Sequence, residues 1–246
     1  MKNKMFVIQS LPRCGTHLLR TALDSHPDID CLGDVFDPNS SGRHGFPKLR
    51  PTPAEVITYC STQARLTGFV AHAHAGLAED ETGAGLDEAY RAQPEVRAGP
   101  GLWQAIPPAT PVITLWRRNL LARHVSQLVA QHSSVWAVRR GDPLPPPPRL
   151  KVDCSQMLAD FARIRALMEI ARRRFPAALR VSYEQLVEQP YTSFAKIQEF
   201  LGVVPKSLSP RTAKQGRPLA DTIINLDEVE ATLRGTHDAR FLEMPA

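Results

Sequence analysis

Residues 5–23 constrain the fold of this chain more than any other stretch. Met5-Phe-Val-Ile8 has the length and the β-branched content of a buried strand. A short loop, Pro12-Arg-Cys-Gly15, follows it, and apolar residues then recur at helical spacing, namely Leu18, Leu19, Ala22 and Leu23. In a strand, loop and helix arranged in this order, backbone N–H groups and the helix N-terminus converge on a phosphate. The sequence therefore predicts an α/β fold with an anion-binding loop beside Arg13.

The loop differs from the common nucleotide-binding loop, in which Gly-x4-Gly-Lys is followed by Ser or Thr. Here Ser10 replaces the first Gly, and the cation Arg13 precedes Gly15. The order Pro-Arg-Cys-Gly-Thr resembles the loop of sulfotransferases that use 3′-phosphoadenosine-5′-phosphosulfate (PAPS), which holds the 5′-phosphosulfate. The resemblance implies that the donor is bound by Arg13, Cys14, Gly15, Thr16 and His17. An ordinary strand-to-helix turn with a surface Arg is the alternative.

The composition is typical of a globular protein with an anionic ligand. The chain has 246 residues, a net charge of +5 and a pI near 9.2, which fits one domain spanning 1–246. A nucleic-acid-binding protein would more often carry a dense basic stripe, so we expect no such partner. No apolar stretch approaches the ~20 residues of a membrane span, and the scattered cysteines suggest neither a zinc site nor disulfides. We expect a cytoplasmic protein without a metal.

A second motif begins at a predicted central strand, 112–116. Arg117, Arg118 and Asn119 follow directly, and a helical pattern then places Ser126 eight positions after Arg118. A strand, Arg-Asn and a Ser at this distance resemble the segment with which PAPS sulfotransferases bind the 3′-phosphate. The resemblance assigns that role to Arg118 and Ser126. Solvated arginines beside a helix start are the alternative.

A third similarity covers 179–202, which is predicted to form a strand followed by a helix. It resembles the Tyr-Glu-Asp-Leu…Phe-Leu-Gly segment of the same enzymes, which implies that Tyr183 lies near the adenine and that Glu184 is structural.

The segment 153–175 is predicted to form a long helix that buries one stripe of side chains. The stripe consists of Leu158, Phe161, Ile164, Met168, Ala171 and Phe175.

The tail after residue 211 resembles that of bacterial carbohydrate sulfotransferases, including nodulation-factor and trehalose-type enzymes. In these, a basic loop commonly folds over the 3′-phosphate, which makes Lys214 and Arg217 candidates for that contact. A flexible, solvated basic loop is the alternative. The segment 38–53 and the proline run 143–148 are expected to shape the acceptor side.

Asp34 is the candidate base, because a strand near residue 32 would deliver it to the edge of the sheet that holds the phosphate loop. Related sulfotransferases carry a Glu at the corresponding point. A turn-capping role, which Asp often has, is the alternative for Asp34. His72 and His74 share one face of a predicted strand and are the reserve candidates. A polar strand face without a catalytic role is their alternative.

These features predict a three-layer α/β fold of the P-loop NTPase type with a mainly parallel sheet. The resemblance implies in-line transfer of a sulfuryl group from PAPS to a hydroxyl on a carbohydrate or glycolipid, with Arg13 and His17 acting in catalysis beside Asp34. Next to Arg13 at a helix N-terminus, the Cys14 thiol is expected to have a lowered pKa. A P-loop kinase and a non-catalytic polyanion-binding protein are the competing functions. A homodimer is left open.

Overall fold

The centre of the computed structural model is one five-stranded sheet in the order β2-β3-β1-β4-β5, with every neighbouring pair parallel. The model describes residues 4–36, 46–47, 51–73, 101–143, 146, 148–212 and 217–245. The strands are β1 (Met5–Ser10), β2 (Ile29–Asp34), β3 (Leu66–His72), β4 (Val112–Trp116) and β5 (Leu179–Ser182). Because β1 lies in the middle, the loop that follows it opens at the centre of the sheet's carboxyl edge, where α/β sheets bind ligands.

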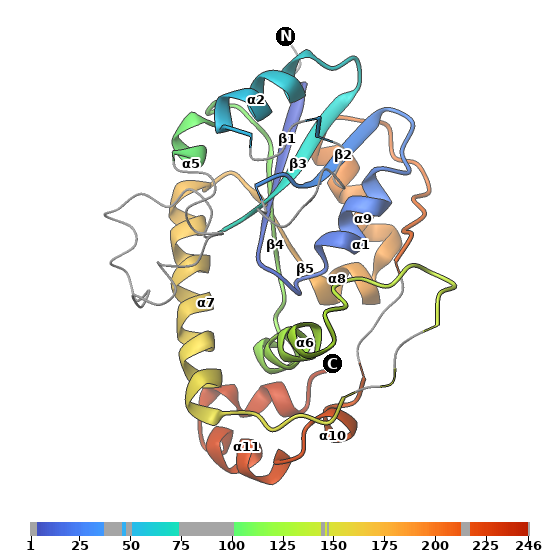
Figure 1. The fold of residues 1–246 in the computed structure, drawn as a ribbon. Helices are drawn as coiled ribbons and strands as arrows, with labels where there is room; N and C mark the ends of the chain where they lie inside the picture. Colours follow the sequence, from blue (N-terminus) through green and yellow to red (C-terminus); the bar gives the residue numbers. More distant parts are fainter. Residues whose placement is uncertain are drawn as a thin grey trace.

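Helices cover both faces of this sheet and its carboxyl end. In Figure 1, α1 and α9 lie on one side and α2 and α5 on the other, while α6, α10 and α11 lie beyond the strand ends. The helices are α1 (Thr16–Leu23), α2 (Pro53–Thr62), α5 (Leu102–Ala105), α6 (Leu120–Ser133), α7 (Cys154–Arg174), α8 (Tyr183–Glu188), α9 (Pro190–Phe200), α10 (Leu219–Thr222), α11 (Leu226–Leu233) and the 3₁₀ helix η1 (His237–Leu242). The layers agree with the predicted fold class, which is confirmed.

The side chains of β1 alternate between two buried clusters. Phe6 and Ile8 belong to the larger cluster, which includes residues of α1, α6, α7 and α9, whereas Met5 and Val7 belong to the cluster under α2 and α5. All six residues of β1 are buried. A strand buried on both faces needs an unbroken apolar run, which explains why this segment could be recognised from its sequence.

The buried face of α7 differs from the predicted stripe. Leu158 and Met168 are 41% and 37% exposed, whereas Met157, Asp160 and Leu167 are buried together with Phe161, Ile164 and Ala171. The prediction missed the true face because a charged residue, Asp160, lies in its centre. An acidic side chain is buried in a helix face only where partners compensate it, and the sequence pattern of α7 alone does not show those partners.

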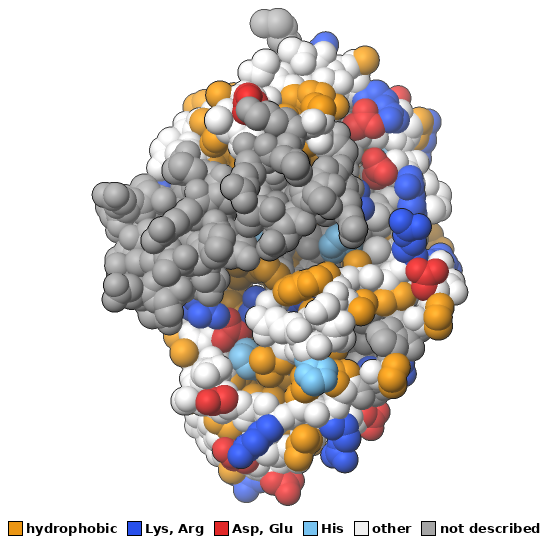
Figure 2. Space-filling view, in the orientation of Figure 1, with side chains coloured by type: hydrophobic (Ala, Val, Ile, Leu, Met, Phe, Trp, Pro, Cys, Tyr) orange, Lys and Arg blue, Asp and Glu red, His pale blue; other side chains and the backbone are white. Residues whose placement is uncertain are grey.

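Several predicted features lie outside the described residues. They are His74, Lys214, most of the segment 38–53, and residues 144, 145 and 147 of the proline run. No described helix combines the length and apolar character that crossing a bilayer requires. On the face drawn in Figure 2, Lys and Arg side chains are interspersed with Asp and Glu over the described surface, and they do not form a continuous basic stripe.

Candidate functional site

The loop between β1 and α1 has an unusual backbone. Gly15 has φ +90°, and a Cβ added there would lie 2.6 Å from Cδ2 of Tyr183. Arg13 has φ 68°, a left-handed conformation that few residues other than Gly adopt. The loop therefore requires Gly15 for two reasons, the backbone conformation and the closeness of the Tyr183 ring.

The N-terminus of α1 is not capped by a side chain of its own. Gly15 occupies the N-cap position without a side-chain hydrogen bond, and the first turn of the helix contains no acidic residue. The first N–H groups of a helix have no partner within the helix, and the helix dipole makes this end attractive to anions. Thr16 and His17 begin the helix and also line the adjacent cavity.

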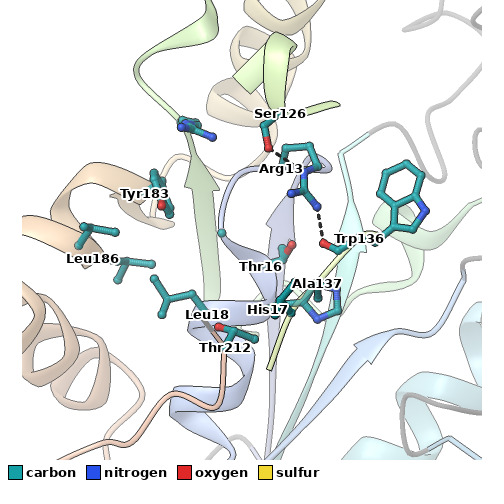
Figure 3. Close-up of a pocket in the computed structure, with 14 residues that line it drawn as sticks. Arg13, Thr16, His17, Leu18, Ser126, Trp136, Ala137, Tyr183, Leu186 and Thr212 are labelled. Carbon is teal, nitrogen blue, oxygen red and sulfur yellow. Dashed lines mark hydrogen bonds between the residues drawn. The ribbon is translucent and has the colours of Figure 1, made fainter. Parts of the chain in front are cut away.

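This cavity has a volume of about 320 Å³ and lies over the loop. Its walls come from the start of α1 (residues 15–18), from Arg117 and Ser126, from the segment 136–138, from α8, and from Thr212. Figure 3 shows Arg13 between Ser126 and Trp136, with Tyr183 and Leu186 on the opposite side. Among the described residues that line the cavity, two are arginine and none is acidic.

The Arg13 guanidinium spans the cavity wall through two hydrogen bonds. Its Nε donates to Oγ of Ser126 at 3.0 Å, and its Nη1 donates to the carbonyl of Trp136. Burial, together with the nearby charges of Arg117 and Arg123, lowers the pKa of Arg13 to about 10. A cation whose pKa is lowered in this way would be stabilised by an anion at the same place.

Arg117 is the second cation of the cavity. It is 6% exposed, its guanidinium carbon lies 4.7 Å from the centre of the Tyr183 ring, and burial lowers its pKa. Its Nε is buried without a hydrogen-bond partner among the described residues. Because buried donors are normally satisfied, this orphaned N–H points to a ligand that accepts a hydrogen bond here.

Arg118, the residue that the motif singled out, is not among the cavity residues. Its side chain is 54% exposed and lies 3.5 Å from a carboxylate oxygen of Glu184 and 3.6 Å from one of Glu188. Ser126, the other residue of the motif, does line the cavity. The pair with Glu188 is exposed on both sides and contributes little stability, so Arg118 can leave Glu188 at small cost, whereas Glu184 is buried.

Glu184 completes the neighbouring junction between β4 and α6. Its carboxylate accepts hydrogen bonds from the backbone N–H groups of Arg118 and Asn119, each at 3.0 Å. The side chain of Asn119 caps α6 by accepting from Ala122 N–H at 2.9 Å. The structural role predicted for Glu184 agrees with this geometry.

The expectation that Cys14 has a lowered pKa is wrong. The thiol is buried, and burial raises its pKa even though Arg123 and Arg117 act in the opposite direction. The prediction counted the neighbouring charge and the helix N-terminus, but it did not include the cost of removing a thiolate from water.

Asp34 and His72 form a pair at the ends of β2 and β3. Nδ1 of His72 lies 2.9 Å from Oδ2 of Asp34, and both side chains are largely buried. His72 pairs in register with Ser10, and the N–H of Ala73 donates to the Ser10 carbonyl at 2.6 Å. The pair therefore lies at the same edge of the sheet as the phosphate loop, directly beside the end of β1.

The remaining candidates are less informative. Arg217 is exposed, and it is not among the residues that line the cavity. The part of the chain that the structure describes contains no group of three His, Cys, Asp or Glu side chains suited to a metal ion.

Two residues of the cavity, Arg117 and Trp136, were not among the candidates predicted from the sequence. The doubled arginine after the strand was a signal for Arg117, but nothing in the sequence indicated the carbonyl of Trp136.

Comparison with known proteins adds an independent line of evidence. The model of the sulfotransferase family matches residues 6–205. Nodulation protein H of Rhizobium meliloti (strain 1021) is 24% identical over 97% of this chain and 95% of that protein, and Nodulation protein H of Rhizobium tropici is 23% identical over 97% and 93%.

Two solved structures are also similar. A sulfotransferase from Alicyclobacillus acidocaldarius has a TM-score of 0.49 at 15% identity, over 97% of this chain and 93% of that chain. The sulfotransferase domain of the Synechococcus PCC 7002 olefin synthase has a TM-score of 0.45 at 17% identity, over 97% and 93%. Because the family model matches most of the sequence, this chain belongs to the sulfotransferase family.

Proposed function

We propose that the protein transfers a sulfuryl group from PAPS to a hydroxyl group of a carbohydrate or glycolipid. The observation that carries this proposal is the cavity over the β1–α1 loop, where an uncapped helix N-terminus meets the half-buried Arg13, the buried Arg117 and no described carboxylate. The relatives called nodulation protein H and the sequence motifs favour a glycan acceptor over other hydroxyl compounds.

The residues of the cavity fit an anionic donor. The orphaned Nε of Arg117 and the lowered pKa of Arg13 both favour an anion in this cavity, whose described lining has no carboxylate. We assign the 5′-phosphosulfate to Arg13, Cys14, Gly15, Thr16 and His17, mainly through backbone N–H groups. The Tyr183 ring offers a flat surface for the adenine.

The 3′-phosphate is assigned to Ser126 and Arg118. In this assignment the Arg118 side chain leaves Glu188 and turns toward Ser126 when the donor binds. Lys214 and Arg217 are proposed to approach the same phosphate from the tail. Arg117 is proposed to contact the donor from the cavity wall beside Tyr183.

In the reaction, PAPS supplies an activated sulfuryl group. The acceptor oxygen forms a bond to sulfur, the bond between sulfur and the 5′-phosphate oxygen breaks, and 3′,5′-ADP leaves. Arg13, His17 and the N–H groups at the start of α1 stabilise the charge that develops on the leaving oxygen, a type of contact whose loss typically costs about 10²–10³ in rate. Asp34, held beside His72, takes the proton of the acceptor hydroxyl.

Binding of 3′,5′-ADP, measured by calorimetry beside 5′-AMP and ATP, tests the donor site. Wild type should prefer 3′,5′-ADP. Arg117→Ala should weaken both 3′,5′-ADP and 5′-AMP, because Arg117 lines the cavity beside the Tyr183 ring. Arg118→Ala should weaken 3′,5′-ADP alone, because 5′-AMP has no 3′-phosphate. Preference for ATP, or no nucleotide binding at all, would overturn the proposal.

Turnover of labelled PAPS tests the base. Asp34→Asn should lower kcat by about 10²–10⁴, the usual contribution of a general base, and should leave the Kd for 3′,5′-ADP unchanged. His72→Gln keeps a polar side chain beside Asp34 and should cause a smaller loss. Unchanged kcat in Asp34→Asn would remove Asp34 from the mechanism.

A further inference from the structure

A buried ionic cluster joins α6 to α7 behind the phosphate loop. Asp160 on α7 is 4% exposed, and one of its carboxylate oxygens lies 2.7 Å from Nη1 of Arg123 and 2.9 Å from Nδ1 of His124. Its other oxygen accepts from Arg163. Figure 1 shows the two helices converging beyond the carboxyl end of the sheet.

Arg123 connects this cluster to the loop. While its Nη1 is held by Asp160, its Nε donates to the carbonyl of Pro12 at 3.2 Å. Pro12 immediately precedes Arg13, whose backbone is in the left-handed region with φ 68°. The guanidinium thus bridges a carboxylate on α7 and the backbone of the residue before the strained position.

The charges explain why Asp160 is needed. Arg123 lies close enough to Arg13 to help lower its pKa, so without a counter-ion it would add a third positive charge beside Arg13 and Arg117. Burial alone would raise the pKa of Asp160, but the hydrogen bond from His124 and the charges of Arg123 and Arg163 hold it well below its usual value. Asp160 is therefore a carboxylate at neutral pH and neutralises Arg123.

A left-handed backbone at a residue other than Gly persists only where the surroundings hold it. The backbone hydrogen bond recorded inside the loop, from Cys14 N–H to the Leu11 carbonyl, is long at 3.4 Å. The contact from Arg123 to Pro12 is shorter and comes from a rigid, buried side chain. It is therefore well placed to fix the loop.

We propose that Asp160 is a positioning residue of the donor site: it holds Arg123 against the Pro12 carbonyl and so fixes the loop conformation that directs Arg13 into the cavity. This inference rests on the proposed function, because the donor is what Arg13 is positioned to bind. It assigns a role in donor binding to a residue of α7 that does not line the cavity.

The bridge requires an arginine. The Nε and Nη1 atoms of one planar guanidinium reach the loop and the carboxylate at the same time, in a fixed relation to each other. A lysine at position 123 keeps the charge but has a single nitrogen on a flexible chain. Arg123→Lys should therefore loosen the loop even if it preserves the ion pair with Asp160.

Calorimetric Kd values for 3′,5′-ADP, taken well below each variant's Tm, test the proposal. Asp160→Asn and Arg123→Lys should each raise the Kd by roughly 10- to 100-fold, the size of effect that misplacing a binding group causes. Glu169→Gln is the matched control, because Glu169 is an exposed carboxylate on the same helix that also pairs with two arginines, Arg172 and Arg173. It should bind like wild type.

A merely structural role for Asp160 would lower the Tm and leave the Kd of the folded protein unchanged, and that result would overturn the proposal. If Asp160→Asn does not fold, Arg123→Lys decides alone, since it retains the charge of the cluster. Failure of folded wild type to bind 3′,5′-ADP is a different outcome: it would refute the proposed function itself, and the positioning role with it.

Discussion

The β4–α6 and β1–α1 junctions lie next to each other at the carboxyl edge of the sheet, and each leads from a parallel strand into the N-terminus of a helix. They differ in how the positive end of that helix is compensated. The β4–α6 junction provides its own negative charge: Glu184 accepts hydrogen bonds from two backbone N–H groups, and Asn119 caps the helix. The β1–α1 junction, on the adjacent parallel strand, has a glycine at its N-cap and no acidic residue in its first turn.

The difference shows which junction is available for a ligand. A helix N-terminus attracts negative charge wherever it occurs. At β4–α6 the protein satisfies this attraction internally, which stabilises the fold. At β1–α1 the protein adds the positive charges of Arg13 and Arg117, and the described lining of the cavity has no carboxylate, which favours an external anion there. The comparison predicts that changes at one junction affect binding and changes at the other affect stability.

The largest effect is expected from Gly15→Ala. The substitution places a methyl group 2.6 Å from the Tyr183 ring at a backbone φ of +90°, so the loop and the ring cannot both keep their positions. The Kd for 3′,5′-ADP should rise by roughly 100-fold or more, as a shift of about 1 Å in a binding group can cause. Calorimetry on the folded variant measures it.

Gly202→Ala is the matched control. Gly202 also has a positive φ, +72°, but an added Cβ there meets nothing within 4 Å. The left-handed conformation alone costs about 1–2 kcal/mol, so this variant should be less stable and should still bind 3′,5′-ADP normally. Wild-type binding by Gly15→Ala would contradict the role assigned to the loop.

The β1–α1 junction could be predicted from sequence because its determinants are local. Strand, loop and helix are contiguous, and Gly15, Arg13 and Thr16 are close together in the chain. The same holds for β4 and the start of α6, where an unbroken apolar run leads directly into Arg117 and Asn119. In these segments local residue type and spacing were sufficient.

Features that depend on distant segments were not predictable. The sequence does not show which of two adjacent arginines enters the cavity, because Glu184 and Glu188, more than sixty residues away, hold Arg118 outside. The buried face of α7 was misassigned for a similar reason: Asp160 is buried because residues of α6 compensate its charge. Burial likewise reversed the expected pKa shift of Cys14.

The second prediction concerns the other junction. Glu184→Gln removes the charge and replaces one acceptor oxygen with an amide that cannot accept from a backbone N–H. The free energy of unfolding should fall by about 1–3 kcal/mol, the usual cost of leaving a buried hydrogen-bonding group unsatisfied. Urea denaturation measures this loss, and the Kd for 3′,5′-ADP should change much less than in Gly15→Ala.

Glu188→Gln is the control for this prediction. Glu188 pairs with the same Arg118 but is 49% exposed and accepts no recorded backbone hydrogen bond among the described residues, so its loss should hardly change stability. A Kd increase in Glu184→Gln as large as that of Gly15→Ala would mean that the two junctions do not divide stability and binding between them.

The smallest effect concerns Cys14, whose thiolate would place an internal anion at the β1–α1 junction. Because burial raises the pKa of Cys14, the neutral thiol is favoured, and native protein at pH 8 should react with iodoacetamide at least about tenfold more slowly at Cys14 than unfolded protein does. Peptide mass mapping measures the extent of alkylation, with the partly exposed Cys154 as the internal reference.

The pKa shift of Cys14 also makes stability depend on pH. The stability that the neutral thiol contributes is fully present below its unfolded pKa of about 8.5 and is lost as the pH rises through its higher folded pKa. Rapid alkylation of Cys14 in protein with an unchanged circular dichroism spectrum would show that the junction does hold a thiolate, and the contrast with β4–α6 would then fail.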